Sequence, residues 1–234
     1  MGGSLCLACS AGGNPGAHRA RRRRPSHNQD FPMKILALET SSAVGSIAVS
    51  NAGKITASRK FDIPRGRGAE LFTALQELRP AWSGCNRVAV GIGPGSYNGL
   101  RAACALAGSL QMALGIDLVA VPSPCLLPVS DERYAVAGDA RGGRFYLAGV
   151  RKRRLEGEVR LVTPEEFRLQ RHKKGDIPFY RIGTLAGEDD VPETSPDAAV
   201  LALIAGDLPP ADPATFGPIY LKPPHITQPR GTTR

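Results

Sequence analysis

The chain has 234 residues, enough for one large domain or two small ones, and its composition of 42% hydrophobic and 22% charged residues is typical of a soluble globular protein. No apolar stretch reaches the roughly 18 residues that would span a bilayer, so no membrane span is expected. The formal net charge of +9 favours an anionic partner, but residues 1–32 alone contribute four of those charges.

Residues 1–32 are rich in Gly, Ser, Arg and Pro and lack hydrophobic periodicity, which predicts a disordered leader. An extension upstream of a natural start at Met33 and a mitochondrial-type presequence are the two alternatives. The five cysteines form an odd, widely spaced set, which argues against a disulfide scaffold and favours a reducing cytoplasm. The only CxxC pair, Cys6 and Cys9, has no second ligand pair that would complete a zinc site.

After the leader, short apolar runs alternate with turn residues. Three strands are predicted at 34–39, 44–50 and 54–61, and their short connections favour an antiparallel meander. Apolar residues at helical spacing then predict a helix over 68–78, which Pro80 ends.

A continuous apolar run predicts a buried strand at 87–93, which leads into the glycine-rich stretch GPGSYNGLR. A helix of small residues follows, at about 97–114, and ends at Gly115. The next strand is predicted at 116–122. This βββ-αβαβ order indicates an α/β domain whose sheet is partly parallel and is covered by helices.

Beyond residue 128 the pattern restarts with a strand, a turn at 139–143 and a second strand. A capping box from Thr163 to Glu166 predicts a helix start, and a further helix is expected at 197–206. This half has fewer periodic elements, so we expect it to form the smaller lobe. The predicted domains are the leader, a first lobe with dimerisation helices at 33–128, a reduced second lobe at 129–222 and a Pro-rich tail at 223–234.

The stretch GPGSYNGLR lacks the marks of three catalytic or binding loops. It has no lysine for a Walker loop, no acid after the next strand for a dinucleotide site, and no glycine two residues on each side of Ser96 for a nucleophile elbow. A strand-to-helix turn is the simpler prediction. Gly93 and Gly95 permit backbone angles closed to other residues, Pro94 stiffens the turn, and Ser96 or Asn98 caps the helix. The predicted structural residues are Gly93, Pro94, Gly95, Ser96 and Gly99, and an anion at the free amides is the alternative.

Five stretches, in order and spacing, resemble the bacterial TsaB family: ILALETSSAVGSIAVS, GIGPGSYNGLRAACALAGSL, GDARGGRFYLAGV, RIGTLAG and PIYLK. The likeness covers Met33 to Lys222, and Tyr97-Asn98 stands where the family usually has Phe-Thr. The resemblance implies an actin-like, sugar-kinase-like (ASKHA) fold of two related lobes with mixed sheets, the second lobe reduced.

The resemblance also implies a cytoplasmic, non-catalytic subunit of the complex that makes N6-threonylcarbamoyladenosine (t6A) at position 37 of tRNA. Its implied partners are the catalytic paralogue TsaD, in a heterodimer, and a small ATPase subunit, with tRNA engaged indirectly; a homodimer is the alternative when the subunit is alone. The helix that carries an HxxxH metal pair in TsaD reads RGRGAELFTAL here, without a histidine. We therefore expect no catalytic residue, metal or cofactor.

The resemblance implies that the helices of the first lobe form the partner interface. The residues expected there are Leu71, Leu75, Leu78, Tyr97, Leu100, Arg101, Ala102, Ala105 and Ser109. In this fold ATP phosphates lie between two Gly-bearing hairpins, and the resemblance implies Glu39 with Gly45 and Asp139 with Gly142 as the corresponding residues here. Gly183 stands where the fold has a glycine pair that faces the adenosine. The glycine-threonine pair of the first hairpin is missing, so we expect a vestigial nucleotide site in which both acids are structural.

Two other classes of function remain open. One is an autonomous ATP-dependent transferase or peptidase of the same fold, which the missing HxxxH and lysine-bearing loop disfavour. The other is a direct tRNA-binding module, suggested by the basic charge alone. Arg101, Arg141, Arg144 and the RKRR block at 151–154 are expected to be solvated, with pairing to a partner's acids or to tRNA phosphate as the alternative.

Overall fold

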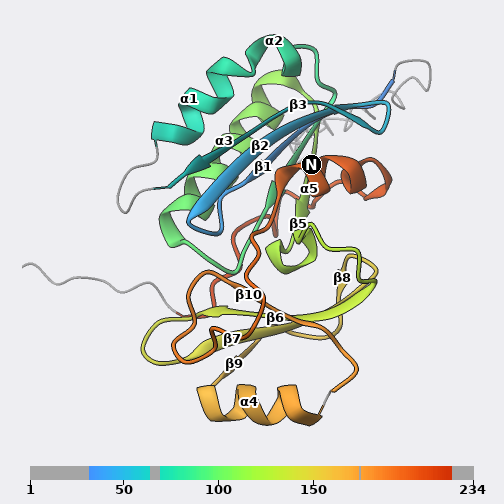
Figure 1. Cartoon of the computed structure of the whole chain (residues 1–234). Coiled ribbons are helices and arrows are strands. Elements are labelled where there is room, and N and C mark those ends of the chain that lie inside the picture. The colour runs from blue at the N-terminus through green and yellow to red at the C-terminus, as the bar shows by residue number, and fades with distance from the viewer. Residues whose placement is uncertain (1–31, 64–68, 174, 223–234) are drawn as a thin grey trace, which may run out of the picture. The chain divides into compact units, whose positions relative to one another are not determined.

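The computed structural model describes residues 32–63, 69–173 and 175–222 (Figure 1). The predicted tail, and the predicted leader apart from Pro32, lie outside these ranges. Within them, no helix combines the length and apolar character needed to cross a membrane. The described cysteines, Cys85, Cys104 and Cys125, are buried free thiols.

The first sheet has five strands in the order β3-β2-β1-β4-β5. They are β1 (Lys34–Glu39), β2 (Val44–Asn51), β3 (Lys54–Asp62), β4 (Arg87–Gly91) and β5 (Asp117–Val121). The first three pair antiparallel as a meander, whereas β4 and β5 join in parallel beside β1. The predicted strands and the partly parallel sheet are confirmed.

Helices cover both faces of this sheet because the side chains of β1 alternate between two apolar layers. Leu36 and Leu38 pack with α1 (Ala69–Glu77) and α3 (Tyr97–Leu114), whereas Ile35 and Ala37 pack with α5 (Ala198–Ile204). Figure 1 shows α1 and α3 on one side of the sheet and α5 on the other. Pro80 ends α1 as predicted, and it also lies in the first turn of a short α2 (Arg79–Trp82).

The ends of α3 are fixed by the residues that the sequence indicated. Ser96 is the N-cap, and its hydroxyl accepts a hydrogen bond from the Gly99 amide at 3.4 Å. Gly115 is the C-cap, with a left-handed φ of 66°. Of the two predicted capping residues, Ser96 therefore has this role, and Asn98 lies inside the first turn.

The second sheet repeats the pairing pattern of the first. Its main path runs β10-β6-β7-β8, with β9 paired to β7. The strands are β6 (Arg133–Asp139), β7 (Phe145–Arg151), β8 (Arg154–Leu155), β9 (Arg160–Val162) and β10 (Phe179–Ile182). An antiparallel hairpin, β6–β7, is joined by the parallel strand β10 on the free side of β6, just as β1–β2 is joined by β4. The chain is therefore an α/β protein with two related mixed sheets.

One helix, α4 (Pro164–Lys173), covers the outer face of this second sheet. Thr163 and Glu166 exchange hydrogen bonds at its start, which confirms the predicted capping box. Phe167 of α4 is fully buried and packs edge-to-face against Phe145 and Phe179.

The end of the described chain returns to the first sheet. The Ser50 hydroxyl of β2 donates to the Ala202 carbonyl of α5 at 2.8 Å, and the Ala198 amide donates to the Ser46 hydroxyl at 2.9 Å. A short 3-10 helix, η2 (Ala205–Asp207), follows α5. The buried guanidinium of Arg87 in β4 donates hydrogen bonds to the Ala205 and Gly206 carbonyls of η2. The predicted second lobe, 129–222, includes α5, but α5 packs on the first sheet. Helical periodicity in the sequence does not show which sheet a helix covers.

Candidate functional site

Glu39, the last residue of β1, is completely buried. Its carboxylate accepts hydrogen bonds from the Ser41 amide at 2.6 Å and from the Ser123 hydroxyl at 2.9 Å. Ser123 begins the short 3-10 helix η1 (Ser123–Leu126), and its hydroxyl accepts from the Gly93 amide at 3.0 Å. Burial raises the pKa of the Glu39 carboxyl above its ordinary value. The Glu39 carboxylate therefore links the end of β1 to η1, and the Ser123 hydroxyl links η1 to the segment that follows β4.

The glycine motif after β4 packs directly on the turn between β1 and β2. The Ser96 amide donates to the Ser41 carbonyl at 2.7 Å, and a Cβ on Gly95 would lie only 2.1 Å from that same oxygen. The Thr40 hydroxyl donates to the Gly99 carbonyl at 2.8 Å, and a Cβ on Gly99 would lie 2.3 Å from the Thr40 carbonyl. Two backbones therefore meet here at a distance that a side chain would prevent.

This contact corrects one sequence expectation. Gly93 has the left-handed φ that was predicted, 87°, but Gly95 does not have a positive φ. Gly95 is required because the Ser41 backbone approaches it closely. The order of glycines along the sequence shows where backbone freedom is available, but it does not distinguish a left-handed turn from a close approach.

Two residues of the first predicted phosphate hairpin, Glu39 and Gly45, are enclosed by the chain's own atoms. Glu39 is inaccessible to a metal-bound water, because the Gly91 backbone and Ser123 contact its carboxylate. Gly45 lies in β2, where a Cβ would overlap the ring of Phe61. Both residues therefore have a packing role, which fits the expectation that the acid is structural.

The second predicted hairpin, between β6 and β7, is open to solvent. Asp139 is exposed, and its carboxylate accepts from the Arg141 amide at 2.7 Å. The Lys222 ammonium donates to the Arg141 carbonyl at 2.7 Å, close to Gly142, whose φ is 64°. Gly183 follows β10 with a φ of 70°. These residues shape two surface turns, and no described interaction joins Asp139 to Glu39.

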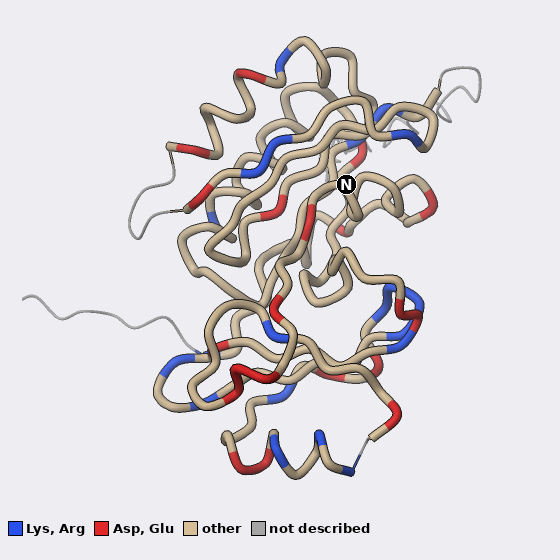
Figure 2. Tube along the Cα trace, viewed as in Figure 1, with Lys and Arg blue, Asp and Glu red and all other residues tan. Residues whose placement is uncertain are grey.

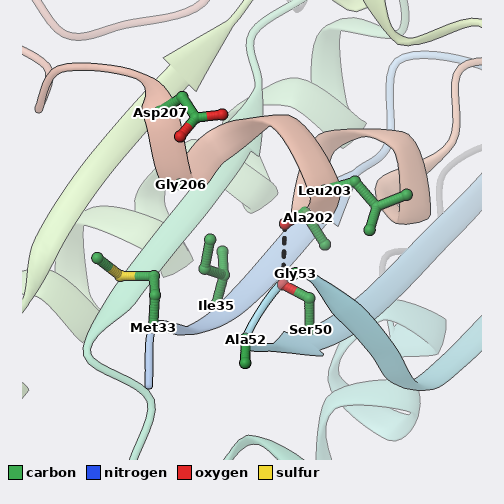
Figure 3. A pocket seen from close by; sticks show the side chains of 9 residues that line it. All are labelled: Met33, Ile35, Ser50, Ala52, Gly53, Ala202, Leu203, Gly206 and Asp207. Carbon is green, nitrogen blue, oxygen red and sulfur yellow. Dashed lines mark hydrogen bonds between the residues drawn. The ribbon is translucent and has the colours of Figure 1, made fainter. Parts of the chain in front are cut away.

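Two cavities in the described part of the chain lie away from these residues. Their volumes are about 260 and 270 Å³, and none of the five predicted nucleotide-site residues lines either one. Figure 3 shows the first cavity, between the β1–β2 hairpin and α5, with Asp207 as its single titratable side chain. Among the described residues there is also no cluster of three or more His, Cys, Asp or Glu side chains that could hold a metal ion.

The exposed face of α3 is almost free of charge. Tyr97, Arg101, Ala105 and Ser109 follow one another at four-residue spacing and are all exposed, and Arg101 is the only charged residue among the 18 residues of the helix. The face continues to Met112, which is 83% exposed. We call these five residues the α3 face.

Not all of the residues expected at a partner interface are exposed. Leu71, Leu75 and Leu100 are buried in the chain's own core, so their side chains are not available to a partner in this structure. Leu78 and Ala102 are half-buried. The sequence could not separate the two sets, because the inner and outer faces of α3 are both built from small and apolar residues.

An aromatic contact that the sequence did not predict lies at the start of the α3 face. The rings of Tyr97 and Tyr220 have centroids 5.2 Å apart, and both side chains are partly exposed. The Arg101 guanidinium lies 5.2 Å from the centre of the Tyr97 ring and donates to its hydroxyl at 2.8 Å. Tyr220 belongs to PIYLK, one of the five stretches that carry the family resemblance, but only its place in the fold shows that it extends the α3 face.

Two of three comparisons with known proteins found relatives. A family model described as TsaD, tRNA N6-adenosine threonylcarbamoyltransferase, matches residues 70–167. The structure of YeaZ from Pseudomonas aeruginosa matches with a TM-score of 0.65 and 25% identity, over 80% of this chain and 99% of that one. A second P. aeruginosa structure is described as an uncharacterized protein with similarity to peptidase YeaZ. It matches with a TM-score of 0.66 and 23% identity, over 81% of this chain and 99% of that one. The comparison with curated proteins found no match.

Proposed function

From the premise that this chain is a TsaB-like protein of the actin-like, sugar-kinase-like fold, we propose that it is a non-catalytic subunit for t6A formation at position 37 of tRNA. It binds a TsaD-type catalytic subunit and stabilises that subunit's active arrangement. The partner transfers the threonylcarbamoyl group from threonylcarbamoyl-adenylate to N6 of adenosine, which forms the new C–N bond, breaks the bond to phosphate and releases AMP and a proton. A small ATPase subunit completes the assembly in the cytoplasm.

The observation that carries this proposal is the α3 face. A helix that is apolar or uncharged all round is usually buried, whereas a solvent-facing helix carries charged residues on its outer side. In α3 the outer positions hold Ala105, Ser109 and Met112 in place of Lys or Glu. Small side chains permit a second helix to approach closely, so this surface suits a helix from another subunit.

The aromatic cluster supplies the residue types that dominate binding energy at protein interfaces. Tyr and Arg are enriched among the few residues whose truncation costs most of the affinity. Tyr97, Arg101 and Tyr220 are already ordered against one another, so they lose little side-chain freedom on binding. We therefore propose these three residues as the anchor of the interface.

The buried acid supports the non-catalytic part of the proposal. A residue that activates water or holds a nucleotide-bound metal has to reach solvent or substrate, and Glu39 is enclosed by its own hydrogen-bond donors. A metal-dependent transferase or peptidase would also need a set of metal ligands, and the described residues contain no cluster of three or more His, Cys, Asp or Glu side chains that could supply one.

Ala105→Glu tests the interface. The new carboxylate would lose its hydration at a helix–helix contact and its bulk would hold the two helices apart, even where it pairs with Arg101, so we expect at least a 100-fold loss of affinity for the TsaD-type subunit, measured by co-purification and by calorimetry. Folding should persist, because residue 105 is exposed, Glu is a good helix former, and Arg101 lies four residues away. Ala186→Glu, the same change at an exposed site after β10, is the matched control and should bind normally.

An Ala105→Glu variant that folds and binds the TsaD-type subunit like the wild type would overturn the proposed interface. The same variants also test the homodimer alternative, which uses the same face. In that case the isolated wild-type chain would be dimeric by light scattering, and Ala105→Glu would be monomeric.

A further inference from the structure

The hairpin between β7 and β8 has an unusual two-residue turn. Its central residues, Lys152 and Arg153, have φ values of 48° and 61°, in the left-handed region. Two-residue hairpin turns of this kind normally contain Asn-Gly or a similar pair, because other side chains disfavour these angles. Lys152 and Arg153 therefore place two cationic side chains at positions whose backbone conformation favours Asn and Gly.

Arg153 holds this turn against the body of the chain. Its guanidinium donates to the Leu127 carbonyl and, at 2.8 Å, to the Val129 carbonyl, both in the segment that follows η1. The Lys152 amide donates to the Glu132 carbonyl at 2.7 Å. The turn is therefore fixed in place, and the cations beside it are presented by a rigid strand pair.

Three arginines form a row across the neighbouring strands. Arg133 of β6 is paired in register with Arg151 of β7, and Arg151 is paired with Arg154 of β8. Paired residues point to the same face of a sheet, and adjacent strands lie about 4.8 Å apart, so the row spans about 10 Å. Like charges placed opposite one another destabilise a sheet. We call Arg133, Arg151 and Arg154 the arginine row.

The row is only partly neutralised within the chain. Glu156 forms an ion pair with Arg133 at 2.9 Å. In the described ranges, no acid lies within ion-pair distance of Arg151 or Arg154, and Lys152 has a 3.9 Å contact with an exposed Glu132. Figure 2 shows the basic segments of this hairpin beside its acidic neighbours. The surface therefore keeps an excess of positive charge that an external anion would relieve.

We propose that the arginine row and Lys152 bind the phosphate backbone of RNA. Guanidinium groups match phosphate oxygens in pairs of hydrogen bonds, and a row of guanidinium groups on adjacent strands suits successive phosphates of one strand. The inference deepens the proposed function and rests on it for the identity of the RNA, since the TsaD-type reaction acts on tRNA. It gives this subunit a direct contact with the substrate, in addition to its contact with the catalytic partner.

The chemistry of the surface favours RNA over an acidic protein. Protein interfaces have aromatic or aliphatic side chains at their centre, whereas nucleic-acid interfaces are polar and strongly positive. Among the described residues, none of the exposed large hydrophobic side chains belongs to β6, β7 or β8. The α3 face shows the opposite composition, so the two surfaces suit two different partners.

The double variant Arg151→Gln/Arg154→Gln tests the inference, with Lys54→Gln/Arg79→Gln as a control that removes the same charge from exposed positions on the first sheet and α2. The probe is a dye-labelled tRNA transcript that carries no modified nucleosides. It is titrated with the full chain at a series of NaCl concentrations. We expect the row variant to bind about tenfold more weakly at low salt, and the slope of log K against log salt to fall by about 1.4 to 1.8. The control should keep both the affinity and the slope close to the wild type.

Equal losses of tRNA affinity in the row variant and the control, or no loss of tRNA affinity in either, would overturn the inference. Co-purification with the TsaD-type subunit is measured in parallel, so a failure of the proposed function, seen as no heterodimer with the wild-type chain, is distinguished from a failure of RNA binding. If the row variant loses its protein partner but not the tRNA, the row recognises an acidic protein surface and the RNA inference is wrong.

Discussion

The two hairpins that open the two sheets place an acid at the same point and then differ in what covers it. Glu39 ends β1 and is completely buried, whereas Asp139 ends β6 with a side chain that is 42% exposed. The Ser41 carbonyl accepts from the Ser96 amide, so the first turn is attached to the start of α3. The second turn is held by a local contact with Arg141 and by Lys222.

The difference comes from the element that follows the parallel strand. In the first half β4 leads into the glycine turn and α3, which pack on the acid's hairpin. In the second half β10 leads into a loop at Gly183, and the chain then returns to the first sheet as α5. One pairing pattern therefore gives a sealed structural acid in one half and a solvent-exposed turn in the other.

Replacing each acid by alanine tests this difference most strongly. Glu39→Ala leaves the Ser41 amide and the Ser123 hydroxyl without their acceptor and opens a cavity, so we expect a loss of about 3 kcal/mol of unfolding free energy. Asp139→Ala should cost less than about 1 kcal/mol, because its contacts are exposed. Chemical denaturation of both variants measures the two values, and similar losses would contradict the comparison.

Alanine substitution of one glycine in each half gives a smaller, related effect. Gly95→Ala places a methyl group against the Ser41 carbonyl and should cost about 2 kcal/mol, since a backbone has to move. Gly142→Ala has room for its methyl group and should cost about 1 kcal/mol, from its left-handed φ alone. Thermal unfolding of the two variants compares them, and an equal or greater cost at Gly142 would show that the first contact is looser than described.

The smallest expected effect is a pH dependence of folding stability that arises from Glu39. Burial raises the pKa of this carboxyl in the folded protein above its ordinary value of 4.5, so its contribution to stability is fully present below that value and is lost as the pH rises through the raised pKa. Compared with Glu39→Gln, which has no charge to bury, the wild type should therefore become relatively less stable from acid to neutral pH. Denaturation midpoints at several pH values measure this trend, and the opposite sign would mean that hydrogen bonds to the charged form outweigh burial.

The elements of the fold could be predicted from the sequence because local signals decided them. Alternating apolar runs located β1, β2 and β3, and the span of α3 at 97–114 was predicted in full. The capping box at Thr163 is a contact between residues three apart, so the sequence displays it directly. Such features depend on neighbours along the chain.

The features missed by the sequence depend on contacts between distant residues. The burial of Leu100 and exposure of Ala105 are decided by which side of α3 meets the sheet, and small or apolar residues occur on both sides in the sequence. The pairing of Arg133 with Arg151 requires the register of β6 against β7. The contact of the Tyr220 ring with the Tyr97 ring joins residues that are far apart in the sequence. Local patterns contain none of this information.

The central proposal, a subunit that is required for the reaction but does not perform it, is tested most directly by reconstitution. The purified chain, the TsaD-type subunit and the ATPase subunit are incubated singly and together with unmodified tRNA and threonylcarbamoyl-adenylate, and t6A is measured by mass spectrometry of the nucleosides. We predict that t6A forms when the TsaD-type subunit and this chain are both present, and that the chain alone forms none. Formation of t6A by the chain alone would contradict the proposal.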